Sequence, residues 1–285
     1  MNTANDLHIS TRVAKNIVFK SGVVIMACAV MLPLILIMYH IVKMGISSIN
    51  WEFFVNVERP AGESGGGIIH SLVGTVILII IAGSIAIPLG VLSGFYIAEN
   101  RKNRFAMAVQ WALDVIQGIP SIVIGIVMYV WVVVPMRHFS ALAGGAALAI
   151  MMLPVVIKST EETVKMIPNS FKEAALALGV PYYKTALKVI LPASLSGIVT
   201  GILIGVSRIA GETAPLIMTA FGNPFFNTNI LKPVDSLPLI IYKYAISPYD
   251  ELHRLAWGAS FVLVMFVLVL NIITRLVVKR WKIEF

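Results

Sequence analysis

The stretch EAALALGVPYYKTALKVILP, residues 173–192, decides how the rest of the chain is interpreted. Its first half is rich in helix formers and stops at Gly179, which permits the tight chain reversal that ends a short helix. Its second half leads to Pro192, a residue suited to the first turn of a new helix. The segment that follows is apolar and long enough to cross a bilayer. The stretch therefore joins two membrane-spanning helices, and its small residues form a face that another protein can approach closely.

The composition of the whole chain agrees with a membrane protein. Of 285 residues, 58% are hydrophobic and only 13% are charged, whereas a soluble domain has about 25% charged residues. The net charge of +8 does not indicate nucleic acid, because Lys and Arg stand at the ends of apolar runs and no basic patch carries interleaved aromatic residues. Such a placement is typical of membrane flanks beside lipid headgroups.

Six segments are apolar over the roughly 20 residues that a spanning helix needs. We therefore expect an all-α membrane protein in which residues 1–285 form a single transmembrane domain. A polar tail, residues 1–19, comes first, and residues 237–247 are too short to span. The predicted spans are about 20–42, 70–98, 106–134, 140–157, 193–221 and 256–278.

The distribution of positive charge predicts the orientation. With the N-terminus inside, fifteen of the 22 Lys and Arg fall on inner segments and six on outer segments. Cytoplasmic loops carry such an excess, so both termini are expected to be cytoplasmic. The inner loop 158–192 is long but helix-forming, and we expect two short helices in it, one starting at Thr160 and one at Asn169 or Ser170.

The inner loop resembles the EAA loop of ABC-importer permeases. That pattern is EAA, three residues, Gly, nine residues, Ile, one residue and Leu-Pro, and here only Ile is changed, to Val189. The resemblance implies a type I ABC-importer permease fold with a cytoplasmic coupling helix between spans 4 and 5. It assigns contact with an ATPase to five residues, Glu173, Ala174, Ala175, Leu178 and Gly179.

Three further stretches, HSLVGT (70–75), QGIPSIVIG (117–125) and GETAPLIMTAFG (211–222), resemble the PstA permease subunits of phosphate importers. This resemblance covers about residues 65–280 and implies one half of a phosphate translocation pathway. It implies a PstC-like second permease, a pair of ATPase subunits and an extracytoplasmic phosphate-binding protein as partners. It also implies a multi-pass protein of a bacterial or archaeal cytoplasmic (inner) membrane, with ATP and Mg on the partner ATPase and no cofactor on this chain.

Two alternatives remain open. Sulfate and molybdate permeases share the EAA loop, so another oxyanion is a possible substrate. A channel or carrier working without an ATPase is a second alternative, although the inner loop and the lack of recognisable inverted halves disfavour it.

The sequence indicates no catalytic machinery of its own. It contains no GxxxxGK[ST] nucleotide-binding pattern and no recognisable nucleophile–base pair. We therefore expect a transport subunit rather than an enzyme. The histidines are scattered at segment ends, where solvated roles and no metal site are expected: His8, His40, His70, His138 and His253.

Arg208 and Glu212 are charges within the apolar fifth span. Arg208 is 16 residues beyond Pro192, or about 24 Å along a helix. A charge at that depth costs on the order of 3 kcal/mol, which suggests that it faces a polar route. A guanidinium suits a passing oxyanion, and Glu212 would pair with it between substrates. The alternative is a purely structural i, i+4 ion pair.

Other polar residues are expected along the same route. Asp114, Gln117 and Ser121 are spaced i, i+3 and i+7 on one face of the third span, unless they only pack locally near Pro120. Thr200 lies on the polar stripe of the fifth span, and Thr213 follows Glu212. Beside that stripe, the small residues Gly197, Gly201 and Gly205 predict close packing against a neighbouring helix.

Overall fold

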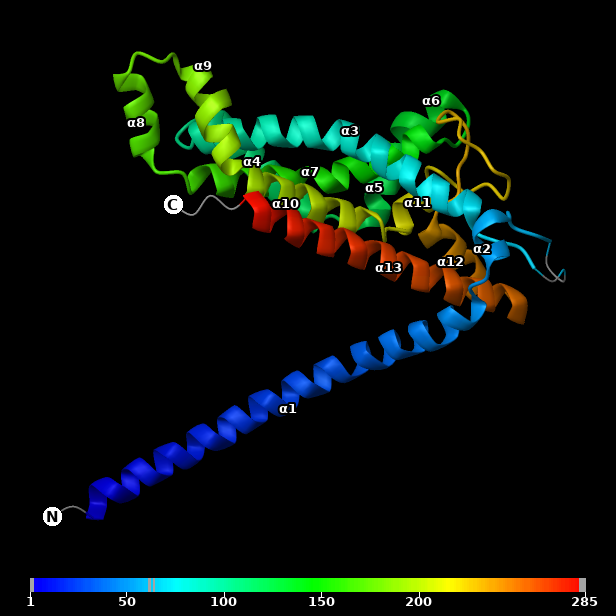
Figure 1. Ribbon diagram of the computed structural model, residues 1–285, viewed down its shortest axis with the longest axis horizontal. Helices are drawn as coiled ribbons and strands as arrows, with labels where there is room; N and C mark the ends of the chain where they lie inside the picture. The colour runs from blue at the N-terminus through cyan, green and yellow to red at the C-terminus, as the bar shows by residue number, and fades with distance from the viewer. Residues whose placement is uncertain (1–2, 61–62, 64, 282–285) are drawn as a thin grey trace.

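The computed structural model describes residues 3–60, 63 and 65–281, and almost all of its regular structure is helical. Four long helices run side by side along the bundle, and a fifth, α1, leaves it at an angle (Figure 1). They are α1 (Thr3–Ser48), α3 (Ile69–Glu99), α7 (Ala141–Lys165), α10 (Leu191–Ile209) and α13 (Asp250–Trp281). Within the described residues, five stretches are long and apolar enough to cross a membrane, and a bent helix pair makes a sixth if it is counted as one span.

The bent pair occupies the predicted third span, 106–134, which is therefore not one continuous helix. The chain turns by 106° between α4 (Arg104–Gly118) and the run that starts with α5 (Ser121–Met128). Pro120 has no N–H to donate and forces Ile119 out of the helical region, to φ −73° and ψ 129°. The run continues through a π-helical turn, η1 (Tyr129–Val133), and α6 (Val134–Met136).

The prediction of a separate helix starting at Thr160 is wrong. Helix α7 continues without a break to Lys165, and both Thr160 and Glu161 are buried in it. Lys158 suggested the end of a span, but its ammonium pairs with Asp114 of α4 and does not end the helix.

The predicted fifth span, 193–221, is also placed wrongly. The spanning run begins at Tyr182 and includes α9 (Tyr182–Thr185), the π-helical turn η2 (Ala186–Ile190) and α10. It ends at Ile209, where tight turns replace the helical pattern, and a new helix, α11 (Ala214–Ile217), starts with Pro215 in its first turn. The chain is therefore irregular between Ala210 and Thr213.

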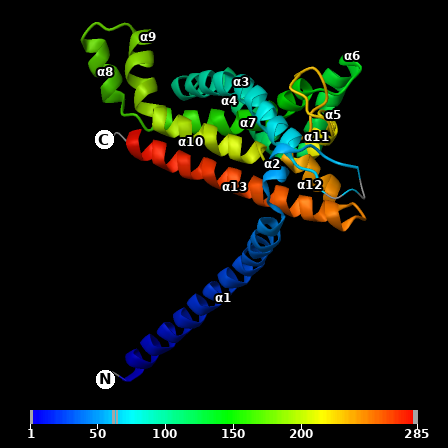
Figure 2. The ribbon, with the colours of Figure 1, turned by 45° about the vertical axis from the view of Figure 1, so that its right-hand side comes forward.

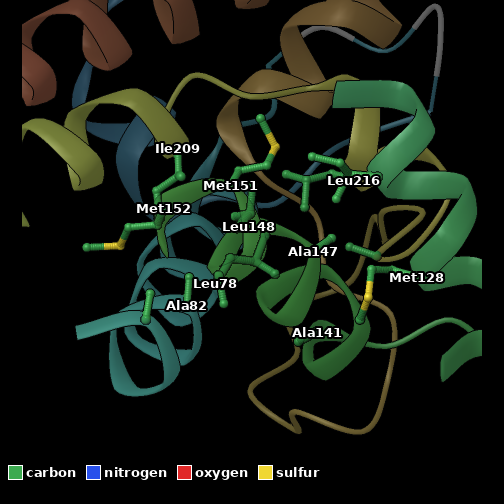
Figure 3. Close-up of a cluster of buried hydrophobic side chains, with 14 of the residues drawn as sticks. Leu78, Ala82, Met128, Ala141, Ala147, Leu148, Met151, Met152, Ile209 and Leu216 are labelled. Carbon is green, nitrogen blue, oxygen red and sulfur yellow. The ribbon is translucent and has the colours of Figure 1, made fainter. Parts of the chain in front are cut away.

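The main core lies where α3 and α7 pack together, with α5, α10 and α11 around them (Figure 3). Leu78, Leu148, Met152 and Leu216 are among its buried side chains. Small residues bring the helices close, as the sequence predicts for α10. An added Cβ would lie 2.2 Å from Thr163 at Gly197, 2.2 Å from Ser159 at Gly201 and 3.0 Å from Met152 at Gly205. The predicted packing ridge is thus confirmed, and its partner is α7.

The two ends of the bundle differ (Figures 1 and 2). At one end, which we call the hairpin end, α8 (Asn169–Ala177) and α9 extend beyond the bundle. At the other, the cap end, α2 (Trp51–Val55), α12 (Leu237–Ala245) and the described residues of 49–68 and 218–249 close over the helices. Helix α1 diverges from the bundle and meets α13, where Gly45 packs against Phe261.

Candidate functional site

A cavity of about 140 Å³ lies where the two helix breaks meet. Gln117, Ile119 and Ser121 line it from the bend between α4 and α5, and Arg208 and Glu212 line it from the end of α10. Irregular backbone within a membrane bundle is tolerated where it is buried in protein or lines a polar space. Both breaks therefore bring polar side chains to one point inside an apolar bundle.

Arg208 occupies the last turn of α10 rather than the middle of a longer helix. The negative end of the helix dipole favours a cation there, which lowers the cost of placing the guanidinium at this depth. Its Nε lies 3.9 Å from Glu212 Oε1, which is longer than a hydrogen bond. The Arg208 side chain is 45% exposed in the single chain, and that of Glu212 is 22% exposed. The guanidinium is thus close to its counter-ion but still accessible to an anion.

The other predicted pathway residues separate into two groups. Gln117 and Ser121 share the cavity with Arg208. Asp114 does not line it: its Oδ1 accepts from Lys158 Nζ at 2.5 Å and its side chain is 65% exposed. Asp114 and Gln117 lie one turn apart on α4, and Lys158 Nζ contacts both, so Asp114 is beside the cavity without lining it. The bend at Pro120 separates Ser121 from this face of α4.

Thr200 and Thr213 are not among the described residues that line the cavity. The Thr200 hydroxyl donates to the Ser196 carbonyl at 2.7 Å, one turn earlier in α10. Thr213 is the residue before α11. The Thr213 side chain makes no capping hydrogen bond to α11, and both residues lie outside the cavity that Arg208 lines.

The predicted coupling residues lie on α8 and the turn after it, at the hairpin end. No side chain of α8 is buried, and Leu178 is 83% exposed. Gly179 has φ +73°, and the N–H of Val180 donates to the Ala175 carbonyl at 3.1 Å. A left-handed residue with this bond is the usual glycine-terminated helix end. The chain reversal expected at Gly179 is confirmed.

Glu99, the last residue of α3, is a functional candidate that the sequence analysis missed. Its carboxylate forms an ion pair with Lys172 of α8 and accepts from the Tyr182 hydroxyl of α9 at 2.6 Å. These partners are 73 and 83 residues away in sequence, so no local pattern reveals the contact. Both helices of the hairpin are thereby tied to the end of one core helix.

The expectation that His70 is solvated is wrong. His70 is only 2% exposed, because α3 begins beneath the cap end. Glu58 and Asp235 lie beside it there, with one ligand atom of each of the three residues within 4.8 Å of the other two.

Residues 86–283 match a family described as "Binding-protein-dependent transport system inner membrane component". The chain belongs to this family. Relatives named "Phosphate transport system permease protein PstA" support the match. The protein from Yersinia pestis is 40% identical, with 87% of this chain and 85% of the relative covered. A "probable" PstA from Methanocaldococcus jannaschii is 37% identical, with 95% and 96% covered. The expected resemblance to PstA permeases is confirmed.

Among solved structures, a similar chain is found in an inward-facing MetNI methionine ABC transporter. It has a TM-score of 0.58 and 21% identity, and the match covers 76% of this chain and 94% of that one. At this identity the likeness concerns the fold alone. The expected all-α, type I ABC-importer permease fold is confirmed, and the chain is a multi-pass membrane permease subunit.

Proposed function

We propose that the chain is the permease subunit of an ATP-driven phosphate importer and forms half of its translocation pathway. The names of relatives from bacteria and an archaeon support phosphate as the substrate. A PstC-like permease would supply the other half, and a pair of ATPase subunits would bind ATP and Mg. An extracytoplasmic phosphate-binding protein would deliver the substrate. This chain binds no cofactor of its own in the proposal.

The observation that carries the proposal is the cavity in which Arg208 meets Gln117 and Ser121. Phosphate is an anion at neutral pH, and a guanidinium meets its oxygens with paired N–H donors that do not lose their protons. The Gln117 amide and Ser121 hydroxyl are further hydrogen-bond donors. Ser121 also begins α5, so the positive end of that helix faces the same space. Broken helices around a substrate site are a recurring arrangement in transporters.

Glu212 explains how the ion would leave. Conduction requires a site that binds firmly enough to be entered and weakly enough to be released. With its carboxylate 3.9 Å from the guanidinium, Glu212 competes with phosphate for Arg208. It would restore the ion pair after each substrate passes.

The hairpin end is the proposed cytoplasmic side, as the excess of inner Lys and Arg indicates. Both termini would then be cytoplasmic. The exposed helix α8 would insert into the ATPase, and Glu99 would transmit its movement to α3 through Lys172 and Tyr182. The cap end would face the binding protein.

Uptake of phosphate by the reconstituted transporter, with its binding protein and ATP, tests the role of Arg208. Arg208→Lys keeps the charge but loses the paired donors, so we expect uptake to fall by about tenfold or more, the equivalent of 1.4 kcal/mol. The matched control is Arg12→Lys, because Arg12 is exposed near the start of α1.

If Arg208 and Glu212 form only a structural ion pair, the opposite result is expected. Arg208→Lys would then retain uptake, and Arg208→Ala would lower the melting temperature. Equal uptake of sulfate and phosphate through their own binding proteins would contradict selectivity for phosphate while leaving the anion pathway intact.

A further inference from the structure

Three ionisable side chains from distant parts of the sequence meet beneath the cap end. His70 Nε2 lies 3.7 Å from Asp235 Oδ2 and 3.9 Å from Glu58 Oε2. One ligand atom from each of the three residues lies within 4.8 Å of the other two. Glu58 belongs to the loop after α2, His70 to the first turn of α3, and Asp235 to the segment before α12.

The backbone around the cluster is built for close approach. At Gly74, one turn after His70, an added Cβ would lie 2.0 Å from the Asp235 carbonyl oxygen. At Gly67 it would lie 2.5 Å from the Asn56 carbonyl oxygen. The N–H of Gly67 donates to the Val57 carbonyl at 3.0 Å, which holds the Glu58 loop against the start of α3. The meeting of the three side chains therefore follows from specific backbone packing.

His70 is buried without any hydrogen-bond partner among the described residues, at either ring nitrogen. Buried polar groups nearly always have a partner, and leaving one without a partner is costly. The hydroxyls of Ser71, Ser236 and Tyr244 are also buried without a partner in the described part of the chain. The imidazole nitrogen that faces the two carboxylates is thus available as a ligand.

The charge of the cluster favours a cation. Glu58 and Asp235 are carboxylates, and Lys243 Nζ, 3.1 Å from Asp235 Oδ2, is the cation beside them. The Lys243 side chain is 37% exposed, so it can turn outward when another cation binds.

We propose that Glu58, His70 and Asp235 form a binding site for a divalent metal ion of the Zn²⁺ class. One imidazole and two carboxylates suit a first-row metal, whereas Mg²⁺ and Ca²⁺ take oxygen ligands. Ligands about 2.1 Å from a tetrahedral metal are about 3.4 Å apart, close to the 3.7 and 3.9 Å that separate His70 Nε2 from the two carboxylates. A bound metal would join the Glu58 loop, α3 and the segment before α12. It would thereby stabilise the cap end.

The test measures metal binding and does not depend on phosphate transport. The complete transporter complex is placed in nanodiscs without nucleotide, and its metal is removed. The complex is then titrated with Zn²⁺ and desalted. Mass spectrometry counts the bound metal. Wild type is expected to bind one more equivalent than His70→Gln. The affinity of that equivalent should fall more than about 100-fold in His70→Gln and Glu58→Gln, because even an outer-shell partner of a metal ligand contributes about 10–100-fold. His138→Gln is the matched control, because His138 is exposed.

Lys243→Gln provides a test in the opposite direction. It removes a competing positive charge, so Zn²⁺ should bind more tightly than in wild type and raise the melting temperature further. Four results would overturn the proposal. They are no Zn²⁺ bound at micromolar concentration, equal stoichiometry in wild type and His70→Gln, weaker binding in Lys243→Gln, or Mg²⁺ binding as tightly as Zn²⁺. If His70→Gln fails to assemble, Glu58→Gln and Lys243→Gln still decide the question.

Discussion

The hairpin end and the cap end of this molecule bury their apolar side chains to opposite degrees. At the cap end, five large side chains form a closed cluster and each residue is at most 2% exposed: Phe53, Ile68, Leu237, Ile240 and Tyr244. At the hairpin end, α8 has no buried side chain and Leu178 is 83% exposed. The hairpin is held to the bundle by the contacts of Glu99 with Lys172 and Tyr182 and by the buried Thr185 of α9.

This difference in burial indicates that the two ends of the chain have different roles. The cap end stabilises the chain itself, because its apolar area is removed from water by the chain's own residues. The hairpin end presents an ordered helix with an exposed apolar face, and such a face is typical of a surface that a partner covers. Substitutions at the two ends should therefore change different quantities.

The largest effect on stability is expected from Phe53→Ala at the cap end. The Phe53 ring is buried, packs edge-on against Phe54 with centroids 5.3 Å apart, and lies against Gly258 of α13. Its truncation should cost about 3–5 kcal/mol, measured by thermal melting of the purified complex. Trp51→Ala is the control from the same helix, because Trp51 is 79% exposed. Similar losses in the two variants would remove the distinction between buried and exposed positions at this end.

A smaller effect is expected from Gly74→Ala. The added Cβ would lie 2.0 Å from the Asp235 carbonyl oxygen, so α3 and the segment before α12 must move apart. Overpacking of this kind costs about 1–3 kcal/mol. Gly22→Ala is the matched control, because no atom lies within 4 Å of its added Cβ. An unchanged melting temperature in Gly74→Ala would show that the cap end is less tightly packed than described.

The smallest effect on stability is expected from Leu178→Ala at the hairpin end. Because the side chain is exposed, the free energy of unfolding should change by less than about 0.5 kcal/mol. The same substitution should weaken retention of the ATPase subunits in a pull-down and reduce substrate-stimulated ATP hydrolysis. Leu32→Ala, at an exposed position of α1, serves as the control. A melting temperature lowered as much as in Phe53→Ala, with the ATPase still bound, would contradict the assignment of the hairpin end.

The parts of the fold that were predictable depend on local composition. Long apolar runs located the spans, and the helix formers before Gly179 predicted a short helix with a left-handed end. The sequence-based predictions were wrong where a residue distant in sequence determined how a side chain is placed. Lys158 suggested the end of a span but pairs with Asp114, and His70 suggested a solvated end but lies under the cap.

Helix breaks were harder to place than helices. The sequence predicts that Pro120 disturbs the helix, but the size of the bend depends on what α5 packs against. Gly125 of α5 lies directly on Pro215 of α11. The end of α10 before Gly211 was missed, because an apolar run continues beyond it to Gly222. Hydropathy records whether a segment is apolar and does not record whether it stays helical.

The sequence by itself determined that this chain is a membrane permease, because apolar length and the pattern around Gly179 are local properties of neighbouring residues. Only the tertiary structure decided which polar residues act together. It brought Arg208 to Gln117 and Ser121, tied Glu99 to the hairpin end, and joined His70 to Glu58 and Asp235. The physical reason is that a charge within an apolar bundle is stabilised by groups close to it in space, and packing, not sequence separation, determines which groups are close.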